Sequence, residues 1–170
     1  LTKKIGDAGK RIHTARSRND QVLVAMHLYL KDELLQIKSQ IKELSENLLD
    51  AAELYKEVLL PGYTHLQVAM PSSFGLWFSA YAESFVDDLH FINAALKVVD
   101  QNPLGSAAGY GSSFPIDREF TTKELGFEIL KYNVVAAQMS RGKSEKSTAF
   151  AMSSVAGTLS KLAMDVCLYM

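Results

Sequence analysis

The segment from Leu60 to Gln67 places an imidazole beside a hydroxyl in a short break between two long helical patterns. Pro61 and Gly62 end the preceding helix, because a proline disfavours helical backbone at the residue before it and a glycine accepts positive φ. His65 can exchange a proton near neutral pH, and Thr64 beside it can donate a hydrogen bond. We expect this pair to stand at a helix start, where it serves either proton transfer or only a hydrogen bond to a loop carbonyl.

A second polar stretch, residues 13–21, gathers two arginines, two amides and two hydroxyls. Arg16 and Arg18 can each form a bidentate pair with a carboxylate, and Asn19 offers both a donor and an acceptor. A serine or aspartate in the same stretch can equally cap the helix that follows. The stretch therefore fits an anion-binding site and a solvated helix start equally well.

The longest helical pattern covers residues 22–58, and no glycine or proline interrupts it. Its apolar residues recur with a mean step of about 3.6, the α-helical period. These residues are Val22, Met26, Leu30, Leu34, Ile37, Ile41, Leu44, Leu48, Ala51, Tyr55 and Val58. One continuous helix of this length would extend about 55 Å at 1.5 Å per residue. Because a small globular domain cannot cover such a rod, we expect a long bundle completed by other chains.

A second long helix is expected over residues 72–100, with Ser72 or Ser73 as its N-cap and an aromatic face in the core. Residues 102–113 are small and glycine-rich, and they lack the Gly-Lys-Ser/Thr spacing of a phosphate loop. They form either an elbow of the bundle or a set of backbone donors for an anion.

The remaining elements are a short helix over 117–125, a segment from Tyr132 to Gly142, and a last helix over 143–170 that is apolar around most of its girth. No strand pattern is evident. The predicted fold class is therefore all-α, with long antiparallel helices of a central helical bundle. We expect residues 1–170 to form one bundle portion of a larger subunit. Within it, residues 1–21 are a substrate-binding loop and helix start, and residues 22–170 are bundle helices with an elbow at 102–116.

The composition is that of a soluble protein: 170 residues, 48% hydrophobic, with a net charge of -1. A nearly neutral chain argues against a nucleic-acid surface, and no apolar run reaches the ~18 residues of a membrane span. The single cysteine, Cys167, cannot form an internal disulfide, which fits a cytoplasmic protein. The sequence has no initiator methionine, and its last helical pattern still continues at Met170, so we expect a piece of a longer protein.

Three segments together resemble the argininosuccinate lyases of the fumarase/aspartase superfamily: residues 10–22 (KRIHTARSRNDQV), 61–67 (PGYTHLQ) and 102–119 (NPLGSAAGYGSSFPIDRE). The Ser-Arg-Asn-Asp-Gln stretch separates these lyases from the rest of the superfamily. The resemblance implies an all-α subunit in a homotetramer, with active sites shared between chains. It also implies a β-elimination that converts argininosuccinate to arginine and fumarate with no metal or organic cofactor.

The resemblance also implies site residues, carried over position by position. His65 and Thr64 match catalytic positions, and His65 acts as acid, base or the group that tunes a partner. The residues matched to substrate binding are Arg16, Arg18, Asn19, Thr64 and Gln67. The family's catalytic serine lies on a Gly-Ser-Ser-x-Met-Pro loop that does not occur before Met170, so the chain alone is expected to be inactive.

Three departures mark a divergent branch. Ala15 replaces a usual glycine, and residues 133–141 lack the acidic residues common in the family. Residues 25–27 (AMH) stand where many members carry an acidic residue followed by leucine and a basic residue. Another superfamily member, such as adenylosuccinate lyase, is one alternative, and the Ser-Arg-Asn-Asp-Gln stretch argues against it. A non-catalytic, crystallin-like helical scaffold is another, and the presence of His65, Thr64 and Asn19 argues against that.

Overall fold

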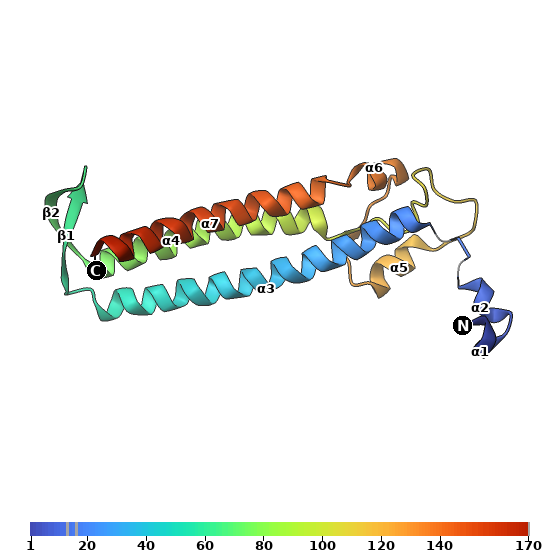
Figure 1. Cartoon of the computed structure of the whole chain (residues 1–170), viewed down its shortest axis with the longest axis horizontal. Helices are drawn as coiled ribbons and strands as arrows, with labels where there is room; N and C mark the ends of the chain where they lie inside the picture. Colours follow the sequence, from blue (N-terminus) through green and yellow to red (C-terminus); the bar gives the residue numbers. More distant parts are fainter. Residues whose placement is uncertain (13, 16, 170) are drawn as a thin grey trace. The chain divides into compact units, whose positions relative to one another are not determined.

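The computed structural model describes residues 1–12, 14–15 and 17–169. Long helices dominate it, as the sequence predicts (Figure 1). The elements are α1 (Thr2–Ile5), α2 (Ala8–Arg11), α3 (Arg18–Leu54), β1 (Leu59–Thr64), β2 (Gln67–Ser73), α4 (Phe74–Val99), β3 (Gln101–Asn102), α5 (Arg118–Glu124), β4 (Ile129–Leu130), α6 (Val134–Met139) and α7 (Lys143–Tyr169). The chain divides into two compact units, one of residues 1–32 and 96–147 and the other of residues 33–95 and 148–170.

The second unit is built from the long helices, with α4 and α7 antiparallel to each other. Hydrogen bonds between them join Tyr81 to Asp165 near one end and Asp88 to Ser154 further along. The core of this unit is largely aliphatic and is formed by buried residues of α3, α4 and α7. These residues are Leu34, Ile41, Leu48, Ala82, Phe85, Ile92, Ala95, Ala151 and Val155. The aromatic face of α4 is thus core in part, and its amino-terminal residues form a separate aromatic cluster.

α3 is one uninterrupted helix of 37 residues, as predicted, but it begins and ends four residues earlier than the predicted range 22–58. The predicted inward register is correct at Leu34 and Ile41, but it is wrong near the helix start. There Val22 is 46% exposed, whereas His27, five residues on, is 1% exposed. The buried face of this part of α3 instead contains Leu23, 2% exposed, and Val24, 9% exposed, together with His27, whose ring is held there by hydrogen bonds.

The His27 ring has a defined tautomer. Its Nδ1 lies 2.8 Å from the carbonyl oxygen of Val99 and 3.0 Å from that of Gln101, and carbonyl oxygens only accept. Nδ1 therefore carries the proton, and Nε2 accepts from the hydroxyl of Ser144 at 2.9 Å. Burial lowers the pKa of His27 and keeps the ring neutral. His27 is a packing residue that ties α3 to the ends of α4 and α7 within this unit.

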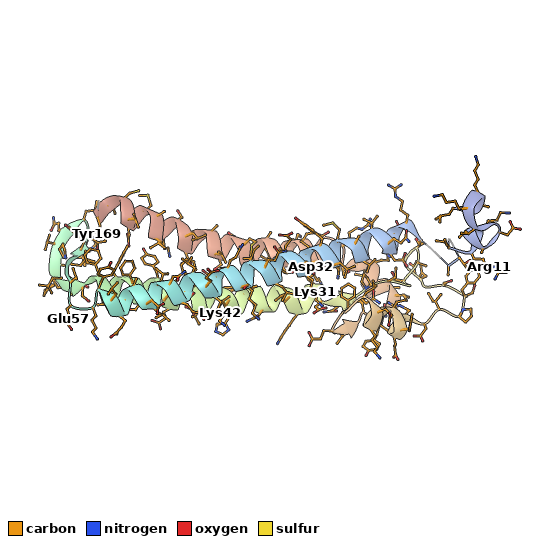
Figure 2. All side chains as sticks on the ribbon, turned by 90° about the horizontal axis from the view of Figure 1, so that it is seen from below. Arg11, Lys31, Asp32, Lys42, Glu57 and Tyr169 are labelled. Carbon is orange, nitrogen blue, oxygen red and sulfur yellow. The ribbon has the colours of Figure 1, made fainter. Side chains whose placement is uncertain are left out.

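The rest of the first unit consists of short elements. β3 and β4 form a two-residue parallel pair that the sequence did not predict. α5 begins where predicted, with Asp117 as its N-cap. Lys31, labelled in Figure 2, joins this region by donating to Asp100 at 2.8 Å and to the carbonyl of Gly126 at 2.5 Å.

The prediction that the segment between α3 and α4 contains no strands is wrong. Residues 59–73 form an antiparallel hairpin in which Pro61 pairs with Pro71, with an irregularity after Gly62. Proline is tolerated because each strand of a two-stranded ribbon is an edge, so one side of its backbone needs no partner. Helix α4 then begins at Phe74, and Ser73 caps it by accepting from the backbone N–H of Leu76 at 3.2 Å.

Gly75 marks a close approach between the start of α4 and the end of α3. A Cβ atom there would lie 2.6 Å from Lys56 Cα and 2.7 Å from the Ala52 carbonyl oxygen, both backbone atoms. We expect Gly75→Ala to lower the free energy of unfolding by about 1–3 kcal/mol despite alanine's better helix propensity. The matched control is Gly157→Ala in α7, where nothing lies within 4 Å; that variant should gain up to about 1 kcal/mol. Urea denaturation of both variants tests the pair, and equal effects of the same sign would contradict the close approach.

Candidate active site

His65 and Leu66 form the two-residue turn of the β1–β2 hairpin, rather than a helix start. Thr64 pairs with Gln67 across the turn, so the two strands bring these side chains together with the imidazole. His65 has φ 51° and Leu66 φ 59°, the left-handed values that a type I′ turn requires at both positions. Such turns usually carry asparagine or glycine. Strained backbone of this kind is concentrated at functional sites, which supports a role for the turn.

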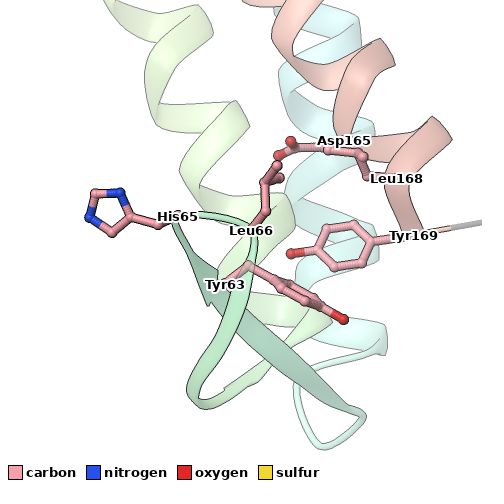
Figure 3. Close-up of a pocket in the computed structure, with 6 residues that line it drawn as sticks. All are labelled: Tyr63, His65, Leu66, Asp165, Leu168 and Tyr169. Atoms are coloured by element: carbon pink, nitrogen blue, oxygen red, sulfur yellow. The ribbon is translucent and has the colours of Figure 1, made fainter.

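The turn presents its side chains to solvent, since Thr64, His65 and Gln67 are all exposed. In Figure 3 the imidazole projects from the hairpin away from Tyr63 and Tyr169. An exposed imidazole on a protruding turn can meet a ligand or another protein surface. Among the described residues, the His65 ring has no hydrogen bond to a loop carbonyl. The structure therefore does not support the interpretation that His65 only satisfies such a carbonyl.

A cavity of about 480 Å³ lies beside the turn in the same unit, lined by Tyr63, His65, Leu66, Asp165, Leu168 and Tyr169 (Figure 3). Burial and the neighbouring Asp165 carboxylate raise the pKa of Tyr169. The same two causes raise the pKa of Tyr81, whose hydroxyl donates to Asp165 at 2.6 Å. Both phenols therefore remain protonated donors across the physiological range.

The polar stretch near the amino end belongs to the first unit. Arg18 and Asn19 open α3 and are both exposed, while Arg16 lies outside the described residues. Ser17 is the N-cap, because its hydroxyl accepts from the backbone N–H of Asn19 at 3.2 Å. Arg141 donates to the Asn19 carbonyl oxygen at 3.4 Å. The helix-start interpretation is thus correct for Ser17, and the exposed side chains of Arg18 and Asn19 remain available for an anion.

Asp20 has a role that the sequence analysis did not find. It is 2% exposed, and its Oδ2 accepts from the backbone N–H groups of Gly105 and Ala107 at 3.0 and 2.9 Å. The glycine-rich loop is thereby tied to the helix turn that carries Arg18 and Asn19. The only signal in the sequence was an acidic residue beside the two candidate ligands, which also fits a helix cap.

The loop has two further supports. Arg118 donates to the carbonyl oxygen of Leu104 at 2.9 Å and to those of Lys131 and Tyr132 at 2.8 and 3.0 Å. Gln138 donates to Ser106 and to the Ala107 carbonyl, both at 3.0 Å. The elbow interpretation of this loop therefore has direct support, since side chains from α3, α5 and α6 all hold it.

Each unit thus gathers part of the predicted site. The second unit brings together Thr64, His65 and Gln67, and the first carries Arg18 and Asn19.

The described residues contain no group of three or more His, Cys, Asp or Glu side chains able to hold a metal ion. Among the described helices, none combines the length and hydropathy needed to cross a bilayer.

A family model described as Lyase matches residues 1–170, so the chain belongs to the lyase family. It is similar to the argininosuccinate lyase of Phocaeicola vulgatus, with 60% identity over 169 residues, which are 99% of this chain and 38% of that protein. The chain therefore spans well under half of that relative's length. A crystal structure of EDDS lyase in complex with formate has a TM-score of 0.94 at 26% identity, over 99% of this chain and 34% of the other. An EDDS lyase variant with bound fumarate has a TM-score of 0.93 at the same identity and coverage.

Proposed function

We propose that the longer protein to which these residues belong is an argininosuccinate lyase, which cleaves argininosuccinate to arginine and fumarate. The observation that carries this proposal is the 60% identity, over 99% of the chain, to a protein of that name. The three sequence segments that resemble the same lyases lie within residues 1–170 and are part of this similarity. The fold shared with an EDDS lyase variant that binds fumarate fits a product of this kind.

The chemistry of such a lyase is the loss of a proton and an amine from adjacent carbons. A base removes the proton from the carbon next to a carboxylate, and the carbanion then expels a guanidinium nitrogen. The carbon acid is very weak, and its conjugate base concentrates negative charge on carboxylate oxygens. Most of the rate enhancement must therefore come from donors directed at those oxygens in the transition state.

The hairpin turn supplies the proton-transfer part of this proposal. His65 acts as acid or base, or tunes the group that does, and its exposed ring can reach a substrate held outside the hairpin. Thr64 donates its hydroxyl to the substrate from the neighbouring strand position. Gln67, paired with Thr64 across the turn, offers an amide on the same structural element.

The start of α3 supplies the anion-binding part. Arg16 and Arg18 are assigned to substrate carboxylates, where a guanidinium forms bidentate hydrogen bonds, and Asn19 adds an amide donor. Asp20 supports this turn from behind through its bonds to the loop at Gly105 and Ala107.

We further propose that the protein is a cytoplasmic homotetramer of arginine biosynthesis, that its active sites are shared between subunits, and that it works without a cofactor. Residues 1–170 would be the central helical-bundle portion of its subunit. Support for association comes from the large apolar side chains that α7 leaves exposed, among them Phe150 at 72% and Leu168 at 63%. Exposed apolar surface on long helices is typical of an interface between subunits.

The proposal predicts that the full-length protein releases fumarate from argininosuccinate, which can be followed by the absorbance of fumarate. Adenylosuccinate, assayed in parallel at the same concentration, should give no fumarate above background. Release from adenylosuccinate alone would assign the protein to another lyase of the superfamily. No release from either substrate by a folded tetramer would favour a helical scaffold without activity.

A further inference from the structure

Asp165 is a carboxylate without an ion-pair partner among the described residues. It lies on α7, and its Oδ2 accepts from the indole N–H of Trp77 at 3.1 Å and from the hydroxyl of Tyr81 at 2.6 Å. Both donors are neutral, so they satisfy one oxygen without balancing the charge. Lys161, one turn earlier on the same helix, is exposed and takes part in none of the recorded salt bridges.

Aromatic rings surround this carboxylate. The ring centroids of Tyr63 and Tyr169 are 6.0 Å apart, and those of Tyr169 and Trp77 are 5.6 Å apart. Figure 3 shows Tyr63 on the hairpin beside Tyr169, with Asp165 on the same helix as Tyr169, α7. The cavity that they line measures about 480 Å³, a size typical of sites for small organic ligands.

The chemistry of this lining selects a particular kind of ligand. Aromatic faces attract cations, and an unbalanced carboxylate adds a full opposite charge. A metal ion would require several oxygen or nitrogen ligands, and Asp165 is the one carboxylate of the lining. A guanidinium satisfies both features at once, because it is planar, weakly hydrated, stacks on aromatic rings and donates to carboxylates.

We propose that this cavity binds a guanidinium group, stacked against Tyr63 and Tyr169 with Asp165 as its counter-charge. The wall shared with His65 and Leu66 places the site directly beside the hairpin turn. One extension rests on the proposed function: the bound guanidinium is the end of the substrate that departs as arginine. Asp165 then selects the leaving group, while the proton-transfer groups lie on the turn.

Trp77 is the single tryptophan of residues 1–170, and its indole N–H is bonded to Asp165, so its fluorescence in this chain reports on the cavity. We expect L-arginine to change the fluorescence of Trp77 with a saturable dependence on concentration. L-citrulline is the matched control, since a neutral urea group replaces the guanidinium at nearly the same size. L-lysine tests whether a point charge is sufficient, and it should bind more weakly than arginine.

The variant that tests the counter-charge is Asp165→Asn, whose amide oxygen can still accept from Trp77 and Tyr81. We expect it to weaken arginine binding about tenfold or more, because a charge-assisted hydrogen bond becomes a neutral one and the cation loses its partner. Asp87→Asn, which removes an exposed carboxylate from α4, should leave binding unchanged. If circular dichroism shows that Asp165→Asn loses helix, Tyr63→Leu is the alternative test. It removes one ring of the cavity, leaves the α4–α7 bonds in place, and should also weaken binding.

Three results would overturn the inference: an equal response to citrulline, unchanged arginine affinity in a folded Asp165→Asn or Tyr63→Leu variant, or lysine binding as tightly as arginine. The outcome is separable from that of the proposed function. Arginine binding through Asp165 in a protein that releases no fumarate from argininosuccinate refutes the function alone. Fumarate release that is insensitive to Asp165→Asn, together with no arginine response, refutes the cavity alone.

Discussion

Replacing His65 with asparagine in the full-length lyase is expected to lower kcat by about 10²–10⁴-fold, the usual contribution of a general acid or base. Asparagine keeps a polar side chain of similar reach but cannot exchange a proton near neutral pH. It also tolerates the left-handed backbone that the turn requires, so the hairpin should persist. KM should change little if the ring acts mainly in the transition state. Steady-state fumarate release at saturating argininosuccinate measures the effect.

His90 provides the matched control for this experiment. It is a second exposed histidine in the same unit, on α4 rather than on the turn. His90→Asn should retain parental kcat, and both variants should show the same helical content by circular dichroism. Unchanged activity in His65→Asn would mean that the imidazole takes no part in the reaction. That result would favour the alternative that the protein is a non-catalytic helical scaffold.

Removing the Asp20 carboxylate is expected to produce the largest loss of stability. Asp20→Ala leaves two half-buried backbone donors, Gly105 and Ala107, without their acceptor and should lower the free energy of unfolding by about 3–5 kcal/mol. Asp20→Asn retains an oxygen that can accept both bonds, though more weakly, and should lose only about 1–2 kcal/mol. Urea denaturation gives both values.

Hydrogen exchange locates the effect of these two variants. The amides of Gly105 and Ala107 should exchange faster in Asp20→Ala and remain protected in Asp20→Asn. If the two variants lose equal stability, the carboxylate does not act as the loop acceptor. If the amides remain protected in Asp20→Ala, other contacts hold the loop, such as those of Arg118 and Gln138.

The long helices were predictable because their information is local. α3 contains no glycine or proline, and its apolar residues recur with the helical period over many turns. The boundary at Ser73 was likewise visible, since a serine followed by an aromatic run is a common N-cap signal. The candidate ligands Arg18, Asn19 and His65 could be named from the resemblance, but their roles remain predictions.

The hairpin was not predictable from the same local signals. Its strands carry Pro61 and Pro71 and show no alternation of apolar and polar residues, and most of their side chains are exposed. Pairing between the strands, rather than propensity, creates the element. The segment was correctly recognised as a break, but the break is a protruding ribbon with His65 at its tip.

The roles of Asp20 and His27 depend on contacts between residues far apart in the chain. Asp20 meets a loop 85 residues later, and His27 meets Ser144 across 117 residues. Neither residue stands out by type, because an aspartate in a first helical turn and a histidine beside an apolar stripe are common. Only the folded backbone shows which partners are within hydrogen-bond distance.

The handedness of the His65–Leu66 turn has an energetic consequence for assembly. Two non-glycine residues in left-handed conformation cost about 2–4 kcal/mol together, roughly a 30- to 900-fold bias against this turn, which strand pairing must offset. A neighbouring subunit or substrate that binds this left-handed turn better than other backbone conformations stabilises it further, so that occupancy of the site and population of the turn increase together.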